Sequence, residues 1–272
     1  MSDDKHLISL LESAKAQFGA SALRRLETPL RVTAGLEQRA AADPSRSPGG
    51  IFIPELTAAP WHPSDWLPDA PLLESAALAI RAELDGLLAR REGFQPYDEG
   101  EYGFNPTNLD GQWNVYYLYL EDRVVPQAEA ACPRTVAALR TLPNLAVSAM
   151  FSALTPGTHI EPHCGPTNAI VSLSLGLIIP ADCTIRVGTE TREWREGKCL
   201  VFDDTYEHEV WNRGAGTRIV LLLDAWHPEL TPIERMVLSR ALWRPGEANE
   251  FFQRQRNMLD GQTWWMSSTQ SE

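Results

Sequence analysis

The chain has 272 residues, with 24 Lys and Arg against 36 Asp and Glu, which gives a formal net charge of −12. This acidic balance, with no block of basic residues, argues against a nucleic-acid partner. The chain starts with acids where a secretory signal carries positive charge, and its longest apolar-rich run, residues 169–179, is shorter than the roughly 20 residues that span a membrane. We therefore expect a cytoplasmic protein without a membrane partner.

The N-terminal part of the chain is predicted to be helical. Apolar residues at helical spacing predict a helix over residues 4–18, and a second short helix is expected over 21–30. Residues 41–50 have the composition of a loop. The strongest helical pattern follows at 72–93, where basic residues precede a closing Gly93.

Short β-like runs dominate from residue 113 onward. Between the first two of them residues 127–139 are predicted as a helix, and a last helix is predicted over 231–243, opened by a capping box of Thr231 and Glu234. Such a series of short strands predicts a mostly β fold with flanking helices and a double-stranded β-helix (jelly-roll, cupin-like) core. The predicted strands are residues 113–120, 145–154, 169–179, 184–187, 192–194, 199–203, 209–211 and 218–226.

These elements divide the chain into three parts. We expect an N-terminal helical extension over residues 1–48, a jelly-roll domain over 49–245 and a C-terminal helical tail over 246–272. The length is compatible with one large core in the middle part. No internal repeat interrupts this order.

The cysteines do not indicate a structural metal site. Cys132, Cys164, Cys183 and Cys199 show no Cys-x-x-Cys spacing, which argues against zinc or a thioredoxin-like motif. For a cytoplasmic protein we expect free thiols.

Two histidines in the strand-rich part suggest a different metal site. His163 lies just before one predicted strand, and His208 opens another, 45 residues later (208 − 163). Two strand ends can converge in a jelly roll, and imidazole suits divalent iron, copper, nickel and zinc. Taken singly, each histidine is more often an ordinary surface or core residue. The pair, with Arg218 as an anchor for an anion, favours a redox metal centre.

The sequence around these residues resembles the aspartyl/asparaginyl β-hydroxylase family of Fe(II)/2-oxoglutarate-dependent dioxygenases. The resemblance is carried by P-G-T-H-x-x-P-H-x-G-P-T-N at 156–168, G-L-x-I-P at 176–180, F-D-D-x-x-E-H-E-V-W at 202–211 and D-x-W-H-P-E-L-T-P at 224–232. It implies a dioxygenase that uses Fe(II), 2-oxoglutarate and O2.

The resemblance also implies roles for individual residues. His163 and His208 would ligate iron, and Arg218 would bind the distal carboxylate of 2-oxoglutarate with help from Ser152. An arginine–carboxylate pair is strong and directional, which agrees with this role. We also place Ser172 and Ser174 among the residues that bind the co-substrate.

The carboxylate of the common facial triad is absent, because the position two residues after His163 is Gly165. A water can fill that coordination position, and Glu161 is a less favoured substitute ligand. For His159 we favour a structural role. Asp203 and Asp204 are candidates to orient an imidazole, although a solvated turn is at least as plausible for Asp204.

Aromatic and thiol side chains near the site receive a structural interpretation. We expect Trp194, Trp211 and Trp226 to be core or rim residues and not to stack on the substrate. Cys164 follows His163 directly and so lies on the opposite face of an extended strand. We therefore do not count it as a ligand.

The substrate pocket departs from the family pattern. Positions 150, 170 and 172, basic in the animal peptide hydroxylases, are Met150, Ile170 and Ser172 here, which would leave a substrate carboxylate poorly compensated. We expect hydroxylation of an unactivated C–H bond in a small-molecule, carrier-tethered or amino-acid-derived substrate. The alternatives are a halogenase or desaturase on the same iron centre, or a non-catalytic cupin-like sensor of small acids. The sequence leaves the substrate and the oligomeric state open.

Overall fold

A computed structural model describes residues 3–39, 46, 49–90, 94–97, 113–120 and 123–242. The C-terminal tail expected over residues 246–272 and the helix-closing Gly93 lie outside these described residues. No helix in the described ranges is long and apolar enough to cross a bilayer.

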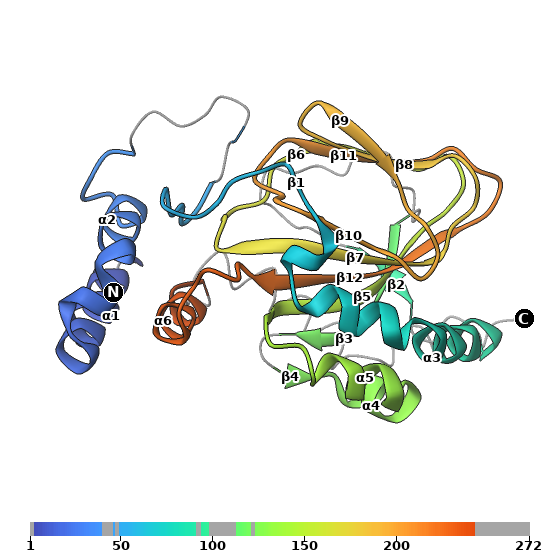
Figure 1. Cartoon of the computed structure of the whole chain (residues 1–272), viewed down its shortest axis with the longest axis horizontal. Coiled ribbons are helices and arrows are strands. Elements are labelled where there is room, and N and C mark those ends of the chain that lie inside the picture. Colours follow the sequence, from blue (N-terminus) through green and yellow to red (C-terminus); the bar gives the residue numbers. More distant parts are fainter. Residues whose placement is uncertain are drawn as a thin grey trace, which may run out of the picture.

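Two antiparallel sheets form the centre of the molecule (Figure 1). The larger has the strand order β1-β10-β7-β12-β5-β3-β2, with β4 beside β3, and the smaller has the order β6-β11-β8-β9. From β5 onward the chain passes back and forth between the two sheets, which is the jelly-roll connection. The predicted fold class is confirmed. The strands are β1 Trp61–His62, β2 Gln95–Pro96, β3 Trp113–Leu120, β4 Arg123–Val124, β5 Leu145–Leu154, β6 His159–His163, β7 Ile170–Ile178, β8 Cys183–Val187, β9 Glu190–Glu193, β10 Cys199–Phe202, β11 His208–Asn212 and β12 Arg218–Trp226.

The larger sheet has two different faces because side chains alternate along each strand. On its outer face Leu173, Leu221 and Phe151 belong to the main core. Helices α3 (Asp69–Arg90), α4 (Pro126–Ala131) and α5 (Pro133–Leu139) lie on that side (Figure 1). α3 directs apolar residues toward it at three- to four-residue spacing, namely Leu73, Ala77, Ile80, Leu84 and Leu87. The inner face, turned toward the smaller sheet, carries polar residues.

A second core lies at one end of the molecule, on the left of Figure 1. Helices α1 (Asp3–Phe18), η1 (Ala20–Leu23), α2 (Arg24–Thr33) and α6 (Pro232–Leu242) build it together with strand ends such as Trp226. η2 (Ser64–Trp66) is a separate single turn. The predicted capping box of α6 is present, because the Thr231 N–H donates to Glu234 Oε2 at 2.8 Å and the Glu234 N–H donates to Thr231 Oγ1 at 3.2 Å.

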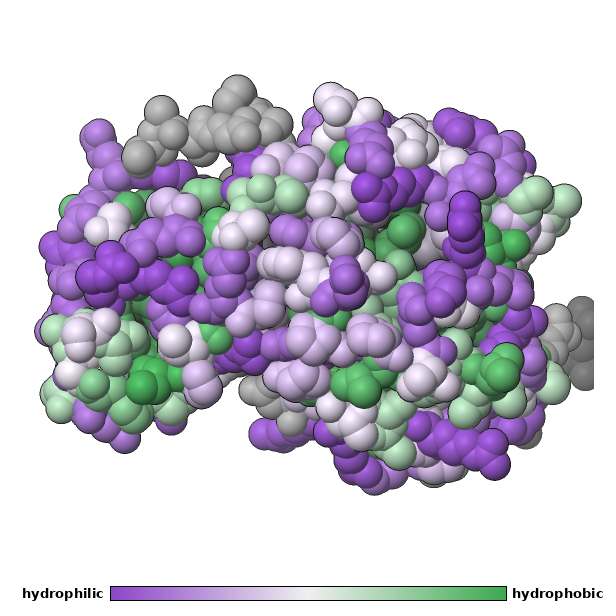
Figure 2. Space-filling view, viewed as in Figure 1, coloured by the Kyte–Doolittle hydropathy of each residue, from purple (hydrophilic) through white to green (hydrophobic). Residues whose placement is uncertain are grey.

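The surface in Figure 2 mixes hydrophilic and apolar side chains, and the apolar ones form small separate areas. Charged residues make up 22% of the chain, close to the share of about 25% in typical soluble domains.

Most predicted elements are present, and two differ in an informative way. The eight predicted strands appear with ends shifted by at most two residues. The helix predicted over 127–139 is two helices, because Pro133 lacks an N–H and restricts Cys132, which adopts φ −133°. Strand β6 was not predicted. Its Pro162 is unusual in a strand and is tolerated because β6 is at the edge of its sheet.

Candidate metal centre

The pairing of β6 with β11 brings the two predicted histidines together. His163 ends β6, His208 begins β11, and the two are register partners. Their ring centroids are 4.0 Å apart. Residues distant in the sequence therefore face each other at one end of the smaller sheet.

Backbone carbonyls fix the orientation of both imidazoles. Nδ1 of His163 lies 2.8 Å from the carbonyl oxygen of Glu161, and Nδ1 of His208 lies 3.1 Å from that of Tyr206. A carbonyl only accepts hydrogen bonds, so each Nδ1 must carry the proton and each Nε2 the lone pair. This is the arrangement of metal-binding histidines, whose second nitrogen donates to a carbonyl or carboxylate.

The protonation state of the pair also suits a metal. Burial lowers the pKa of His163, and burial together with the neighbouring His163 lowers the pKa of His208 to about 3. At neutral pH both rings are neutral, which is the form that ligates a metal.

The space that a side chain at position 165 would take is filled by another residue, Asp204. A Cβ at Gly165 would overlap the carboxyl group of Asp204, and the Gly165 N–H donates to the Asp204 carbonyl at 2.7 Å. Asp204 Oδ1 is buried without a hydrogen-bond partner among the described residues. Burial, followed by the charges of Asp203 and Asp224, raises the Asp204 pKa well above its usual range. Asp204 does lie in a turn and is half-buried, but its Oδ1 is shielded from solvent, so the solvated turn is present only in part.

These observations fit a metal held by two histidines. No cluster of three or more potential ligands occurs in the part of the chain that the structure describes. The orphaned oxygen of Asp204 is the type of buried acceptor that a metal-bound water satisfies, since buried polar atoms otherwise have partners. His163 and His208 are thus the residues that would hold the ion.

Other acidic and imidazole groups have structural partners on the outer side. Glu161, with a side chain 45% exposed, lies 3.6 Å from Nδ1 of His159. Nε2 of His159 lies 2.9 Å from Glu209, and its ring stacks on Trp211. The contacts of Glu161 do not support its role as a substitute ligand. The structural role favoured for His159 agrees with these contacts.

Arg218 is a buried cation at the start of β12. It is 3% exposed, its guanidinium lies 4.8 Å from the ring centroid of Trp194, and its Nε has no partner among the described residues. Burial lowers its pKa to about 10, so it remains charged at neutral pH. A buried guanidinium with an unsatisfied donor is ready to receive an anion.

The three predicted serines lie on the inner face of the larger sheet, as Arg218 does. Ser152 accepts a hydrogen bond from the indole of Trp113 at 3.0 Å, and Ser174 accepts one from Trp194 at 2.9 Å. Since an indole only donates, each hydroxyl keeps its own proton to donate to a ligand. Ser172 lies further along β7, where its register partner is Asp224.

Asp224 is a further acid on this face that sequence reasoning missed. Its Oδ2 accepts a hydrogen bond from Ser148 at 2.8 Å, and burial raises its pKa to about 6. Its charge contributes to the raised pKa of Asp204. No sequence signal marks it, because it stands within the apolar run of β12.

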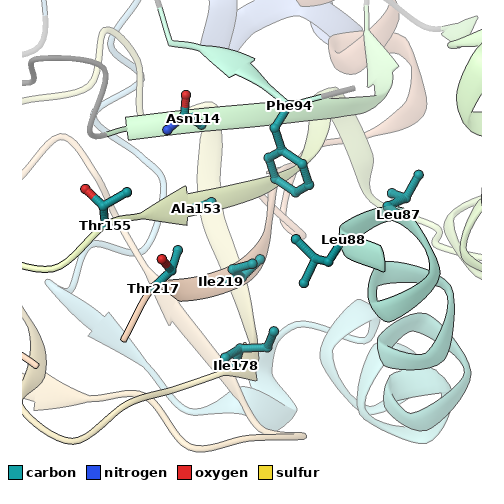
Figure 3. Close-up of a pocket in the computed structure, with 9 residues that line it drawn as sticks. All are labelled: Leu87, Leu88, Phe94, Asn114, Ala153, Thr155, Ile178, Thr217 and Ile219. Carbon is teal, nitrogen blue, oxygen red and sulfur yellow. The ribbon is translucent and has the colours of Figure 1, made fainter. Parts of the chain in front are cut away.

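A groove of about 510 Å³ lies on the other face of the larger sheet (Figure 3). Ala153 and Ile219, which line it, adjoin Ser152 and Arg218 in the sequence and therefore point the opposite way. Leu87 and Leu88 of α3 form its other wall. The sheet separates this apolar groove from the inner face.

Known proteins are similar in sequence to this chain over most of its length. A family model described as Aspartyl/Asparaginyl beta-hydroxylase matches residues 74–228. The aspartyl/asparaginyl beta-hydroxylase of Mus musculus is 36% identical over 192 residues, which are 67% of this chain and 25% of that protein. The chain belongs to the aspartyl/asparaginyl β-hydroxylase family. This confirms the resemblance inferred from the motifs.

Relatives within the family differ in the substrates that their names state. The ornithine lipid ester-linked acyl 2-hydroxylase of Rhizobium tropici is 37% identical over 64% of this chain and 62% of that protein. The chain spans about a quarter of the length of the mouse and human β-hydroxylases.

A solved oxidoreductase of the 2OG-Fe(II) oxygenase family from Burkholderia pseudomallei covers 54% of this chain and 78% of its own at 16% identity. Its TM-score is 0.37. That likeness is too low to support an argument, and the fold assignment rests on the strand order.

Proposed function

We propose that this protein is an Fe(II)/2-oxoglutarate-dependent dioxygenase that hydroxylates an unactivated C–H bond. The observation that carries the proposal is the His163–His208 pair, whose rings lie 4.0 Å apart and whose Nδ1 atoms both face backbone carbonyls. Family membership supports the same activity.

Each residue of the site has a role that follows from its chemistry. His163 and His208 hold the metal, and Arg218 binds the distal carboxylate of 2-oxoglutarate, with Ser152 as a second donor. Ser172 and Ser174 are further hydroxyl donors on the same face. When bound, iron with 2-oxoglutarate and O2 supplies the oxidation of the C–H bond, with succinate and CO2 as co-products.

The substrate class follows from what the inner face lacks. Met150 and Ser172 replace basic family residues, and Asp224 adds an acid. These positions of the inner face therefore provide no positive charge to bind a substrate carboxylate. We propose a small-molecule, carrier-tethered or amino-acid-derived substrate. The cytoplasmic location stays a prediction from the sequence.

A halogenase or a desaturase on the same iron centre is distinguished from a hydroxylase by its products, and a sensor by the absence of turnover.

His163→Ala and His208→Ala should each abolish turnover and weaken Fe(II) binding strongly, because the two imidazoles supply the protein ligands. Anaerobic Fe(II) titration and succinate release from 2-oxoglutarate measure the two effects. His159→Ala is the matched control, since its ring bonds Glu209 on the outer side. Either site variant with full iron binding would refute the metal assignment.

A substrate screen tests the second half of the proposal. Amino-acid-derived small molecules, aspartyl peptides and ester-linked acyl lipids are compared by substrate-stimulated succinate release, and the products are identified by mass spectrometry. We expect stimulation by the first group. Efficient hydroxylation of a peptide or a lipid would overturn the substrate class and leave the iron site standing. Tight 2-oxoglutarate binding without succinate would favour a sensor.

A further inference from the structure

Arg46, from the predicted loop before the jelly roll, is buried against the turn that leads to His208. Its Nη2 donates to Asp203 Oδ2 at 2.6 Å and its Nε donates to Thr205 Oγ1 at 2.9 Å. The side chains of Arg46 and Asp203 are 6% and 4% exposed. Buried charge-assisted pairs of this type are among the strongest polar contacts in proteins.

Two aromatic rings hold the guanidinium in place. Its central carbon lies 4.8 Å from the ring centroid of Phe52 and 4.8 Å from that of Tyr206. The backbone of Arg46 also forms an antiparallel bridge with Tyr206. A planar, always charged group fits between rings while it binds two oxygens, and a lysine ammonium does not reproduce that geometry.

The turn that Arg46 grips, residues 203–206, supplies several parts of the metal centre. The Tyr206 carbonyl orients His208, and the Asp204 carbonyl accepts the N–H of Gly165. The Asp204 carboxyl group occupies the space above Gly165. Asp203 closes the turn by accepting the N–H of Thr205 at 3.0 Å. Whatever fixes this turn therefore fixes His208 and Asp204 as well.

We propose that Arg46 is a positioning residue of the metal centre, acting as a clamp on turn 203–206. The proposal rests on the proposed function, because turn 203–206 positions a metal centre only if His163 and His208 hold iron. Arg46 lies outside residues 74–228, the region matched by the family model, and its partner Asp203 is 157 positions away in the sequence. The N-terminal segment of this chain thus takes part in building the site. The contact also replaces the role expected for Asp203, which was to orient an imidazole.

The test is Arg46→Met in the full chain, measured by anaerobic Fe(II) titration and thermal unfolding. We expect iron affinity to fall about tenfold, the lower end of what outer partners of metal ligands contribute. Arg46→Lys should restore part of it. Arg25→Met is the matched control, because Arg25 of α2 forms a partly buried ion pair with Glu234 at 2.6 Å. This control should lower the unfolding temperature without changing iron affinity.

The outcomes separate this inference from the proposed function. Wild-type iron affinity in Arg46→Met would overturn the clamp, and so would an equal loss in Arg25→Met, which would indicate general destabilisation. Asp203→Asn removes the same ion pair and replaces Arg46→Met if that variant does not fold. It should weaken iron binding to a similar extent, and unchanged affinity would refute the proposal. Unchanged iron binding in His208→Ala would instead refute the site itself.

Discussion

At the scale of single residues, Gly165 and Asp204 act as a pair. The glycine is required because the carboxyl group of Asp204 fills the space that a side chain would use. A carboxylate introduced at position 165 therefore does not simply rebuild a facial triad. It first has to displace Asp204, which is itself close to the histidines.

Gly165→Ala should destabilise the fold by about 1 to 3 kcal/mol through overpacking. Asp204→Ala in the same chain should relieve that cost, so the two substitutions together should cost less than their sum. Urea unfolding of the single and double variants measures the coupling. Strictly additive effects would show that the two groups do not share this space.

Arg218 is the second residue whose role can be isolated. Arg218→Ala should raise the Kd of 2-oxoglutarate by about one to two decades, because hydrogen bonds to charged groups contribute about 1.5 to 3 kcal/mol. Calorimetric titration of the anaerobic iron-loaded protein measures it. Arg192→Ala is the matched control, because this arginine of β9 also packs on a tryptophan ring, that of Trp61 at 4.5 Å. A loss of affinity for the primary substrate alone would assign Arg218 to that substrate.

At the scale of elements, the start of α6 links the helices of the second core. Glu234 caps its own helix through Thr231 and also binds Arg25 of α2 through both carboxylate oxygens. One side chain therefore anchors the C-terminal helix to the N-terminal helices. Such a double role makes its loss more costly than the loss of the cap alone.

Thr231→Ala should cost about 1 kcal/mol, the usual effect of losing an N-cap side chain. Glu234→Ala should cost about 2 to 4 kcal/mol, because it also leaves Arg25 without its partner. Chemical denaturation of the metal-free protein distinguishes them. Equal losses would mean that the pair with Arg25 contributes little to stability.

At the scale of the whole molecule, the raised pKa of the half-buried acid Asp224 predicts that stability depends on pH. Its pKa of about 6 in the folded protein lies above the value of about 3.9 of an unfolded aspartate. Between these values the folded state holds a proton that the unfolded state has lost. The free energy of unfolding therefore falls as pH rises through this window.

Asp224→Asn should remove the contribution of Asp224 to this dependence while keeping an acceptor for Ser148, and the raised pKa of Asp204 leaves a dependence of the same sign. Relative to the parent protein, the variant should gain up to about 3 kcal/mol between pH 4 and pH 7, since one pKa unit corresponds to about 1.4 kcal/mol. Urea unfolding of the metal-free proteins across this range measures the difference. Asp65→Asn, at an exposed position, is the control, and parallel profiles for Asp224→Asn and the parent would contradict the prediction.

The sequence by itself determined the features that depend on neighbouring residues. Short β-like runs between turns predicted strands such as β5 and β12, helical spacing predicted α3, and the Thr231–Glu234 spacing predicted a cap that the structure contains. Motifs also singled out His163 and His208, which the structure brings face to face. These signals repeat or lie close together along the chain, so they are visible without a fold.

Only the tertiary structure decided what surrounds the two histidines. The carboxyl group of Asp204 above Gly165, the clamp of Arg46 on Asp203 and the acid of Asp224 behind Ser148 join residues far apart in the sequence. Strand β6 escaped prediction because a proline is tolerated only where the strand lies at a sheet edge, and edge position is a property of the whole sheet. Such contacts have no period and no local spacing. These contacts form only when the two sheets pack together and the N-terminal segment packs against them.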